Sequence, residues 1–321
     1  MMPPAGQAVV AAPVLSPPTS PPHSQDEIDL WNDVQAALSA IPFYFRSPLN
    51  ISGVSATDLH TFNTSLSSTI EQEVVNLLNG IRRDTWDRYG KWRVYGFERQ
   101  AQRFPDVVLR TNTPGARPIL MGIELKGWYV LAKEGEPSYR YVVTPAVCSE
   151  FDLVAVLPWA FSSVIAGTPF LFEPYVVPAK FAAEYRNWHW LYGINSRSAG
   201  SVRDVVSSTA VQQYPAKTDP ISDRGVPDGG GNFGRFARTH LMDEFIQTIE
   251  AKLLAGIPVN AWRRFLRVFT DDATSQNIDS FIATIARERR RDPAVANFTS
   301  QQKEELQRLF EDLQRFFENR Q

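Results

Sequence analysis

Cysteine is almost absent from this chain of 321 residues, in which Cys148 is the single example. An intrachain disulfide is therefore impossible, and the sequence fits a reducing compartment such as the cytoplasm. Histidine is also scarce, because only four are spread along the chain and they form no recognisable cluster. That scarcity argues against a zinc site and leaves Cys148 without a partner for nucleophilic catalysis. We expect Cys148 to be a small buried apolar side chain.

Long hydrophobic runs and a strong net charge are missing too. No apolar stretch approaches the roughly 18 residues that a membrane span needs, and the run at 9–12 has no preceding positive charge and is interrupted by prolines. We therefore expect neither a membrane span nor a signal peptide. The formal net charge of −2 excludes a protein that coats nucleic acid non-specifically. It still permits a sequence-specific one, because acidic residues can offset a local basic groove.

The chain is 43% hydrophobic, which is enough for a sizeable core. Residues 1–23 are crowded with Pro, Ala and Ser, so we expect a disordered tail. We place one main domain at 24–245 and a helical region packed on it at 246–321. The expected helices cover 24–41, 55–66, 67–83, 178–192, 241–255, 258–269, 278–290 and 301–317, and the expected strands 93–98, 104–110, 119–128, 139–143, 153–158 and 170–177. This order predicts an α/β fold with a mixed sheet of about five strands and helices on both sides.

Two neighbouring strands organise the rest of the chain. Residues 104–110 and 122–128 are rich in Val, Ile and Leu, and the turn signal Thr113-Pro114-Gly115-Ala116 lies between them. A hairpin folded about this turn places Asp106 close to opposite Ile123 and Glu124. Because side chains alternate along a strand, Glu124 and Lys126 share one face while the residues between them point into the core.

Two carboxylates and one ammonium beside a core cost several kcal/mol unless they are paired or bind a metal. Asp106 and Glu124 supply the hard oxygen ligands that Mg²⁺ prefers. A metal there would activate water and orient a phosphate, and Lys126 could position that water or help to deprotonate it. The alternative is a hairpin with solvated charges on its exposed face. The apolar run at 119–123 argues against that alternative, since it is too hydrophobic for a solvent-exposed edge strand.

Pro105-Asp106 followed by Glu124-Leu125-Lys126 resembles the signature of the PD-(D/E)XK nuclease superfamily. The longer runs at 104–110 and 122–141 resemble a group of bacterial type II restriction endonucleases, and the likeness extends over roughly residues 65–245. The resemblance implies a restriction-endonuclease-like core and Mg²⁺-dependent cleavage of double-stranded DNA. It also implies that Asp106 and Glu124 are metal ligands and that Lys126 is the catalytic lysine.

A third carboxylate is expected from the helix over 67–83. Glu71 and Glu73 flank its apolar stripe on opposite sides, so either one could lean over the hairpin. Many nucleases of the superfamily use a glutamate from an early helix. The sequence of residues 70–75 resembles the family in a way that favours Glu71. The alternative is that both are ordinary solvated helix charges.

The stretch 196–238 is the candidate DNA-contacting loop. Glycines at 229–231 and 234 permit a close backbone approach to DNA. Basic and amide side chains supply charge and hydrogen bonds to phosphates or base edges, and the expected DNA-binding residues are Lys217, Arg224, Asn232, Arg235 and Arg238. A flexible surface loop would have much the same composition. The aromatic and polar segment 185–190 could track a DNA backbone, although aromatic residues at helical spacing more often belong to a core.

The function that the resemblance implies is a type II restriction endonuclease that cuts at a short specific site. A palindromic site would require a two-fold homodimer, and a DNA methyltransferase would be the companion that protects the host. Two rivals stay open. One is another nuclease of the same fold, with a repair or structure-specific role, and the other is a DNA-binding protein that does not cleave.

Overall fold

The structure is a computed structural model of the chain. The residues that it describes are 23–52, 59–83, 90, 92–113, 115, 118–132, 134–194, 202–268, 276, 280 and 283. The expected tail up to residue 22 lies outside the described residues. So does the helix expected over 301–317, together with most of the one expected over 278–290.

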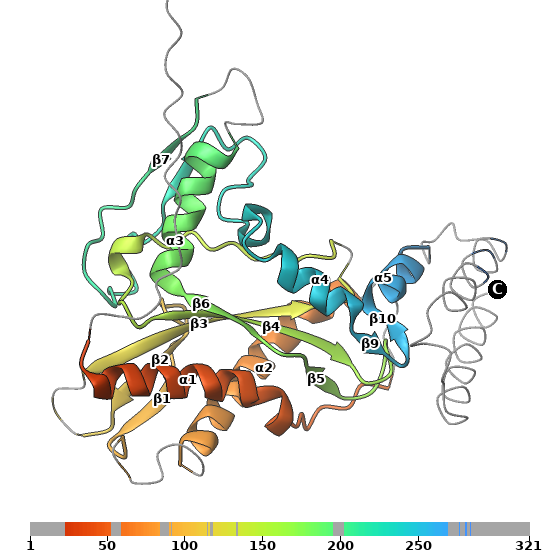
Figure 1. The fold of residues 1–321 in the computed structure, drawn as a ribbon, viewed down its shortest axis with the longest axis horizontal. Coiled ribbons are helices and arrows are strands. Elements are labelled where there is room, and N and C mark those ends of the chain that lie inside the picture. Colours follow the sequence, from red (N-terminus) through yellow and green to blue (C-terminus); the bar gives the residue numbers. More distant parts are fainter. Residues whose placement is uncertain are drawn as a thin grey trace, which may run out of the picture.

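A six-stranded mixed sheet forms the centre of the described part of the chain (Figure 1). Its strands are β1 (Tyr95–Arg99), β2 (Val107–Thr111), β3 (Ile119–Tyr129), β4 (Leu153–Phe161), β5 (Pro169–Leu171) and β6 (Tyr175–Pro178). The first three are antiparallel neighbours in chain order, β3 pairs with β4 in parallel, and β5 and β6 both run antiparallel to β4. The predicted α/β class with a mixed sheet is confirmed, with six strands instead of about five.

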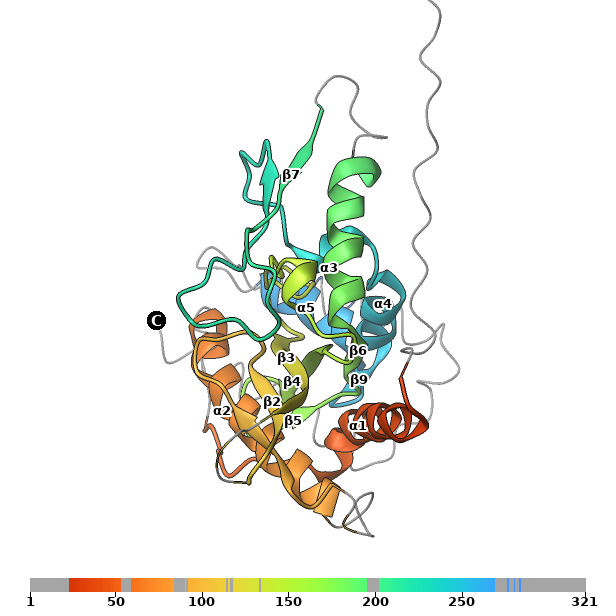
Figure 2. The ribbon, with the colours of Figure 1, turned by 90° about the vertical axis from the view of Figure 1, so that its left-hand side faces the viewer.

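Helices cover the sheet on two sides. They are α1 (Gln25–Tyr44), α2 (Leu59–Ile81), α3 (Ala179–Trp188), α4 (Asp243–Ala251) and α5 (Val259–Val268). In both views α3 and α4 lie above the sheet, whereas α1 and α2, which contact each other, lie beside its lower strands (Figures 1 and 2). α2 packs against β1 and β3, whereas α3 packs against β4 and β6. Every residue of β4 is buried, as expected for an apolar strand that is covered on both faces.

Two of the strand predictions are wrong in detail. The stretch 139–143 does not join the sheet, because Arg140 and Val143 make isolated bridges to Arg235 and Ser222. These partners lie far along the chain, so a local pattern could not reveal them. The single strand expected over 170–177 is two strands, β5 and β6. Pro174 lies between them and has no N–H to donate to a ladder.

Within the described residues, up to Val268, the helix predictions are confirmed in type and differ at their limits. Ser24 and Glu27 form the expected capping box of α1. That helix continues two residues past Pro42, because a proline removes one hydrogen bond and need not stop the last turn. The two helices expected over 55–83 form one continuous helix, α2. No glycine or proline separates them in the sequence, so nothing interrupts the hydrogen-bond ladder.

Two short β ribbons in the described part after residue 201 were not expected from the sequence. The irregular stretch 196–238 contains a two-stranded ribbon of β7 (Asp204–Val206) and β8 (Arg224–Val226). A second short ribbon, β9 (Leu253–Leu254) with β10 (Ile257–Pro258), connects α4 to α5. Trp262 and Phe265 of α5 join the same buried core as α1, so the described part of the expected C-terminal region, up to residue 268, shares the core of the main domain. No described helix is both long and apolar enough to cross a membrane.

A buried ion pair ties α3 to the segment that precedes β8. Arg186 donates to Asp223 at 2.8 Å, and the two side chains are 1% and 0% exposed. The same guanidinium donates to the carbonyl oxygens of Tyr141 and Val143. Burial lowers the pKa of Arg186, while the charge of Asp223 opposes this shift. The arginine thus holds together three segments that share no regular sheet.

We predict that Arg186→Met lowers the free energy of unfolding by about 3–5 kcal/mol, because Asp223 would remain charged and buried without its partner. Denaturant unfolding followed by circular dichroism measures this loss. Lys180→Met is the matched control, since it removes an exposed ion pair with Glu150 from the same helix and should cost at most about 1 kcal/mol. Equal losses in both variants would contradict the assignment.

Candidate active site

The β2–β3 hairpin brings Asp106 and Glu124 together as predicted. Val107 pairs with Ile123, so the next residues along each strand, Asp106 and Glu124, lie opposite each other. The backbone N–H of Asp106 donates to Glu124 Oε2 at 3.2 Å, and Leu125 N–H donates to Asp106 Oδ2 at 2.9 Å. These crossed bonds fix both carboxylates relative to the backbone. The predicted turn residues Pro114 and Ala116 lie outside the described residues.

Gly122 permits the strands to approach each other at this point. A Cβ atom on Gly122 would lie 2.1 Å from Cγ of Pro105, far inside van der Waals contact. The N–H of Gly122 donates to Oδ1 of Asp152 at 2.6 Å, which anchors this part of β3 to the residue that precedes β4. The glycine therefore serves packing and backbone pairing just beside the two carboxylates.

Lys126 completes the cluster on the same face of β3. Its Nζ lies 2.6 Å from Glu124 Oε1 and 3.5 Å from Asp106 Oδ2. Ile123 and Leu125 point to the opposite face and are fully buried, so the predicted alternation is confirmed. Burial lowers the pKa of Lys126, but the attraction of Glu124 and Asp106 outweighs it and leaves the pKa above its ordinary value. The side chain is therefore an ammonium at neutral pH. This favours positioning over deprotonation of water, the two roles left open above.

Glu124 is the most electrostatically unfavourable member of the cluster. Its side chain is 11% exposed. Burial raises its pKa to about 7, and the nearby charge of Lys126 only partly opposes that shift. A carboxylate held in this environment gains from a further positive charge placed beside it.

Glu71 lies next to this cluster, on α2. It interacts electrostatically with Asp106 and Lys126, and Arg99 of β1 lies 3.3 Å from its Oε2 atom. Burial, and then the charge of Asp106, raise the pKa of Glu71. Glu73 is two residues further along α2, a rotation of about 200° around the helix axis. Of the two glutamates that the sequence left open, Glu71 is thus the one beside the hairpin.

The donor set of the cluster fits Mg²⁺, with two protein ligands. Within the described residues no group of three or more His, Cys, Asp or Glu side chains is arranged to hold a metal ion. Mg²⁺ needs less than that, because it commonly binds one or two carboxylates and keeps several waters. Asp106 and Glu124 supply the oxygen atoms, and the raised pKa of Glu124 shows that its negative charge is under-compensated. The ammonium of Lys126 now occupies the space between the two carboxylates.

The predicted DNA-binding residues fall into two places. Lys217 donates to Gln102 Oε1 at 2.5 Å, four residues before Asp106 in the chain. Arg224 is exposed on β8. The structure does not bring these two residues together with the other three.

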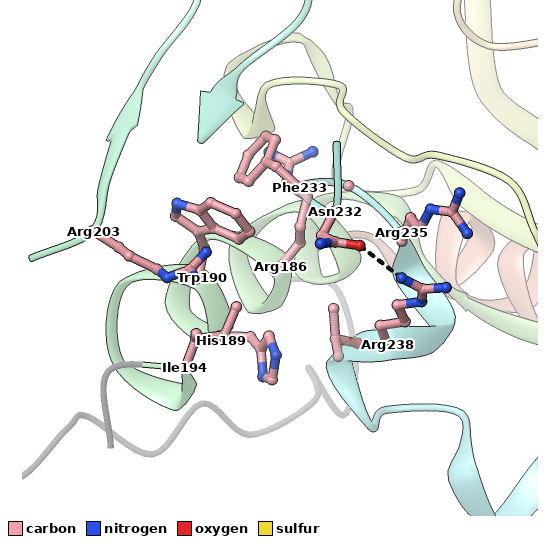
Figure 3. A pocket seen from close by; sticks show the side chains of 11 residues that line it. Arg186, His189, Trp190, Ile194, Arg203, Asn232, Phe233, Arg235 and Arg238 are labelled. Atoms are coloured by element: carbon pink, nitrogen blue, oxygen red, sulfur yellow. Dashed lines mark hydrogen bonds between the residues drawn. The ribbon is translucent and has the colours of Figure 1, made fainter. Parts of the chain in front are cut away.

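Asn232, Arg235 and Arg238 do lie together, around one cavity (Figure 3). Arg238 donates to Asn232 Oδ1 at 2.6 Å. Each arginine also has an acidic partner that sequence reasoning missed: Glu134 lies 3.4 Å from Arg235, and Glu136 lies 2.8 Å from Arg238. Both acids follow the end of β3 and lie about 100 residues before the arginines in the chain. No local pattern in the sequence could therefore have identified these pairs.

The same cavity is lined by residues that no motif identified. They come from the end of α3, from the π-helical turn His189–Gly193 and from the start of β7, and they are Arg186, His189, Trp190, Ile194 and Arg203. The unusual mixture of aromatic and polar residues at 185–190 was the available signal. It fits a core role as well, because Trp190 is only 3% exposed.

Two buried groups elsewhere have structural roles. Cys148 is buried as predicted, and burial raises the pKa of its thiol to about 12. Asp152 accepts hydrogen bonds from Gly122, Ser149 and Tyr214, which join β3, β4 and the 207–222 segment. Burial raises the pKa of Asp152 to about 6. Neither residue lies among the charged groups of the candidate site.

We predict that the stability of metal-free Glu124→Gln, relative to that of metal-free wild type, rises with pH. The folded pKa of about 7 lies above the ordinary 4.5, so the unfolded chain releases its proton first as pH rises. Wild type therefore loses stability between these values, by up to about 3 kcal/mol at about 1.4 kcal/mol per pKa unit, and a neutral glutamine does not.

Chemical denaturation in EDTA at several pH values between 4 and 8 measures the effect. The stability difference between Glu124→Gln and wild type should grow across that range and level off above pH 7. Glu98→Gln, at an exposed position of β1, is the control for the removal of a carboxylate from the sheet. A difference that stays constant with pH would contradict the assigned environment of Glu124.

No protein-family model matches this chain, and no curated protein matches its sequence significantly. The function has to be argued from the chemistry of the site.

Proposed function

We propose that this protein is a Mg²⁺-dependent endonuclease that hydrolyses phosphodiester bonds in double-stranded DNA, and that it acts as a type II restriction endonuclease at a short specific site. The observation that carries the proposal is the convergence of Asp106, Glu124 and Lys126 on one face of β3. Glu71 lies beside them. A purely structural ion cluster would not need two carboxylates around one ammonium, one of them with its pKa raised to about 7 by burial.

Asp106 and Glu124 are the residues that would hold Mg²⁺. When bound there, the ion supplies a Lewis acid that stabilises negative charge on the phosphate and on the attacking water. The hydrogen bonds to Asp106 Oδ2 and Glu124 Oε2 keep the two carboxylates in place during turnover. The ammonium of Lys126 donates hydrogen bonds to the phosphate oxygens and offsets the charge that develops there. Glu71 orients Arg99 and adds negative charge beside Asp106.

Substrate binding would use the basic residues beyond the hairpin. Lys217 lies beside Gln102, close in sequence to Asp106, where it can hold a phosphate of the cut strand. Arg224 is exposed on β8, and Arg235 and Arg238 line the cavity of Figure 3. A palindromic target would be cut by a two-fold homodimer, because symmetric sites match symmetric proteins. Such an enzyme would work in the cytoplasm beside a DNA methyltransferase that protects the host site.

The test of this function is incubation of the full chain with a mixed library of duplex DNA in Mg²⁺, followed by sequencing of the new ends. A restriction enzyme yields ends that share one short sequence, whereas a repair or structure-specific nuclease yields ends that do not. Asp106→Ala and Glu124→Ala should each abolish cleavage and retain DNA binding, since loss of a carboxylate also relieves repulsion of phosphate. Lys126→Ala should lower the rate by about 10²–10³-fold.

Lys126→Arg should restore little of this rate, because a planar guanidinium cannot replace a compact ammonium. The matched controls are Glu150→Ala and Lys180→Ala, which break an exposed Glu–Lys pair and should cut at the wild-type rate. If Asp106→Ala or Glu124→Ala cleaves DNA at a rate within about tenfold of wild type, these carboxylates are not the metal ligands. Absence of cleavage by wild type, with binding intact, would favour the non-cleaving rival.

A separate prediction distinguishes the two glutamates of α2. Glu71→Gln should lower the cleavage rate by roughly 10–100-fold, the usual cost of losing a residue that supports metal ligands. Glu73→Gln removes the same charge two positions away and should leave the rate unchanged. Single-turnover cleavage of one duplex at saturating enzyme measures both. Equal effects in the two variants would place Glu71 outside the site.

A further inference from the structure

The cavity of Figure 3 has a volume of about 370 Å³ and lies outside the carboxylate cluster. Its walls come from three places that are distant in the sequence. One is the end of α3 with the π-helical turn, one is the start of β7, and one is the segment 232–239. A volume of this size falls within the roughly 300–1,000 Å³ that is typical of small-ligand pockets.

The charge of the lining has one sign. Arg186, Arg203, Arg235 and Arg238 line the cavity together with His189, and no aspartate or glutamate is among the lining residues. The acidic partners of three of these arginines, Asp223, Glu134 and Glu136, stand outside the lining. A concave site lined by one sign of charge concentrates ligands of the opposite sign. The occupant should therefore be an anion.

Planar groups make up much of the same wall. Trp190 and Phe233 meet edge to face, with ring centroids 5.3 Å apart. The guanidinium of Arg203 lies 4.3 Å from the ring centroid of Trp190, and that of Arg186 lies 4.9 Å from the ring centroid of Phe233. Aromatic rings and guanidinium planes are the surfaces on which proteins stack nucleobases. The side-chain amide of Asn232, held by Arg238, adds a group that can pair with a base edge.

Unsatisfied donors gather at this wall as well. Three side chains that line the cavity carry a buried N–H with no acceptor within the described residues: Nε1 of Trp190, Nε of Arg203 and Nε of Arg235. Buried donors are normally paired. Acceptor atoms on a ligand, or on water that the ligand holds, would supply the missing partners.

We propose that this cavity binds a nucleotide, with the base against Trp190 and Phe233 and the phosphate on Arg203, Arg235 and Arg238. The ligand chemistry is an aromatic ring joined to a phosphate, which matches the stacked planes and the cationic lining together. The nucleotide can come from two sources. It can be free in solution, or it can be an unpaired nucleotide of DNA, and the second source rests on the nuclease function proposed above.

The experiment has two arms, and both use the full chain in Ca²⁺ in place of Mg²⁺. Binding can then be measured without cleavage of the probe. In the first, 2-aminopurine deoxyribonucleoside monophosphate is titrated with protein and its fluorescence is followed. In the second, the probe is a duplex with one unpaired 2-aminopurine, because an unpaired base costs least to unstack. We expect saturable quenching in at least one arm, since the base stacks on aromatic and guanidinium planes. The arm that responds identifies the source.

Arg203→Gln is the diagnostic variant, because Arg203 is only partly buried and is not a member of the hydrophobic core, so its loss should not unfold the protein. It should weaken binding by at least about tenfold, the usual effect of removing a charge-assisted hydrogen bond. Arg46→Gln removes an exposed arginine that does not line the cavity and should bind as wild type. The deoxyribonucleoside without its phosphate should bind more weakly than the monophosphate.

Quenching in neither arm would overturn the proposal, and so would Arg203→Gln binding like wild type. Equal binding of the nucleoside and the monophosphate would show that the arginines do not bind the phosphate, and it would overturn the proposal. The result is independent of the nuclease assay. If the protein binds the free nucleotide but cuts no DNA, the proposal for the cavity stands and the proposed nuclease function fails. If it cuts DNA but quenches neither probe, the nuclease function stands and the proposal for the cavity fails.

Discussion

The register of β3 is the constraint on which the candidate site depends. This strand pairs with β2 on one side and with β4 on the other, so a slip by one residue would break two ladders at once. It would also turn Glu124 and Lys126 into the core and expose Ile123 and Leu125. Asp152 and Gly122 secure the register near its start, through a hydrogen bond and a contact that leaves no room for a Cβ. Backbone pairing and apolar burial thus fix the positions of the charged groups.

The charged groups themselves oppose folding. Glu124 and Lys126 are largely buried, and burying an ion pair often costs more than the pair returns. The raised pKa of Glu124 expresses that cost directly, since the protein holds this carboxylate where its charged form is disfavoured. A position that was selected for stability alone would carry an apolar residue here. Two charges on the central strand β3 and a third just before β2 carry this cost together, and that cost is the reason for proposing a catalytic role for the cluster.

The hairpin could be predicted because its information is local. Apolar runs, a turn signal and alternation place Asp106 opposite Glu124 without knowledge of any other element. The helix period likewise separated Glu71 from Glu73, but only the packing of α2 on β3 decides which one faces the hairpin. The cavity could not be predicted, because Arg203 and Phe233 are 30 residues apart and both meet Trp190 only in three dimensions. For the same reason 139–143 looked like a sheet strand, although its partners are Ser222 and Arg235.

That misassigned segment links the two proposed sites. Tyr141 donates its N–H to the carbonyl of Gly234, and its own carbonyl accepts from Arg186, so it supports two walls of the cavity. Burial first, and then the charges of Cys148 and Glu124, raise the pKa of Tyr141 well above its ordinary value, which places its phenol within electrostatic reach of the carboxylate cluster. Its hydroxyl also donates to the carbonyl of Ala179 at the start of α3. A fully buried residue that is held at three points moves little, so the walls of the cavity that it supports keep their positions.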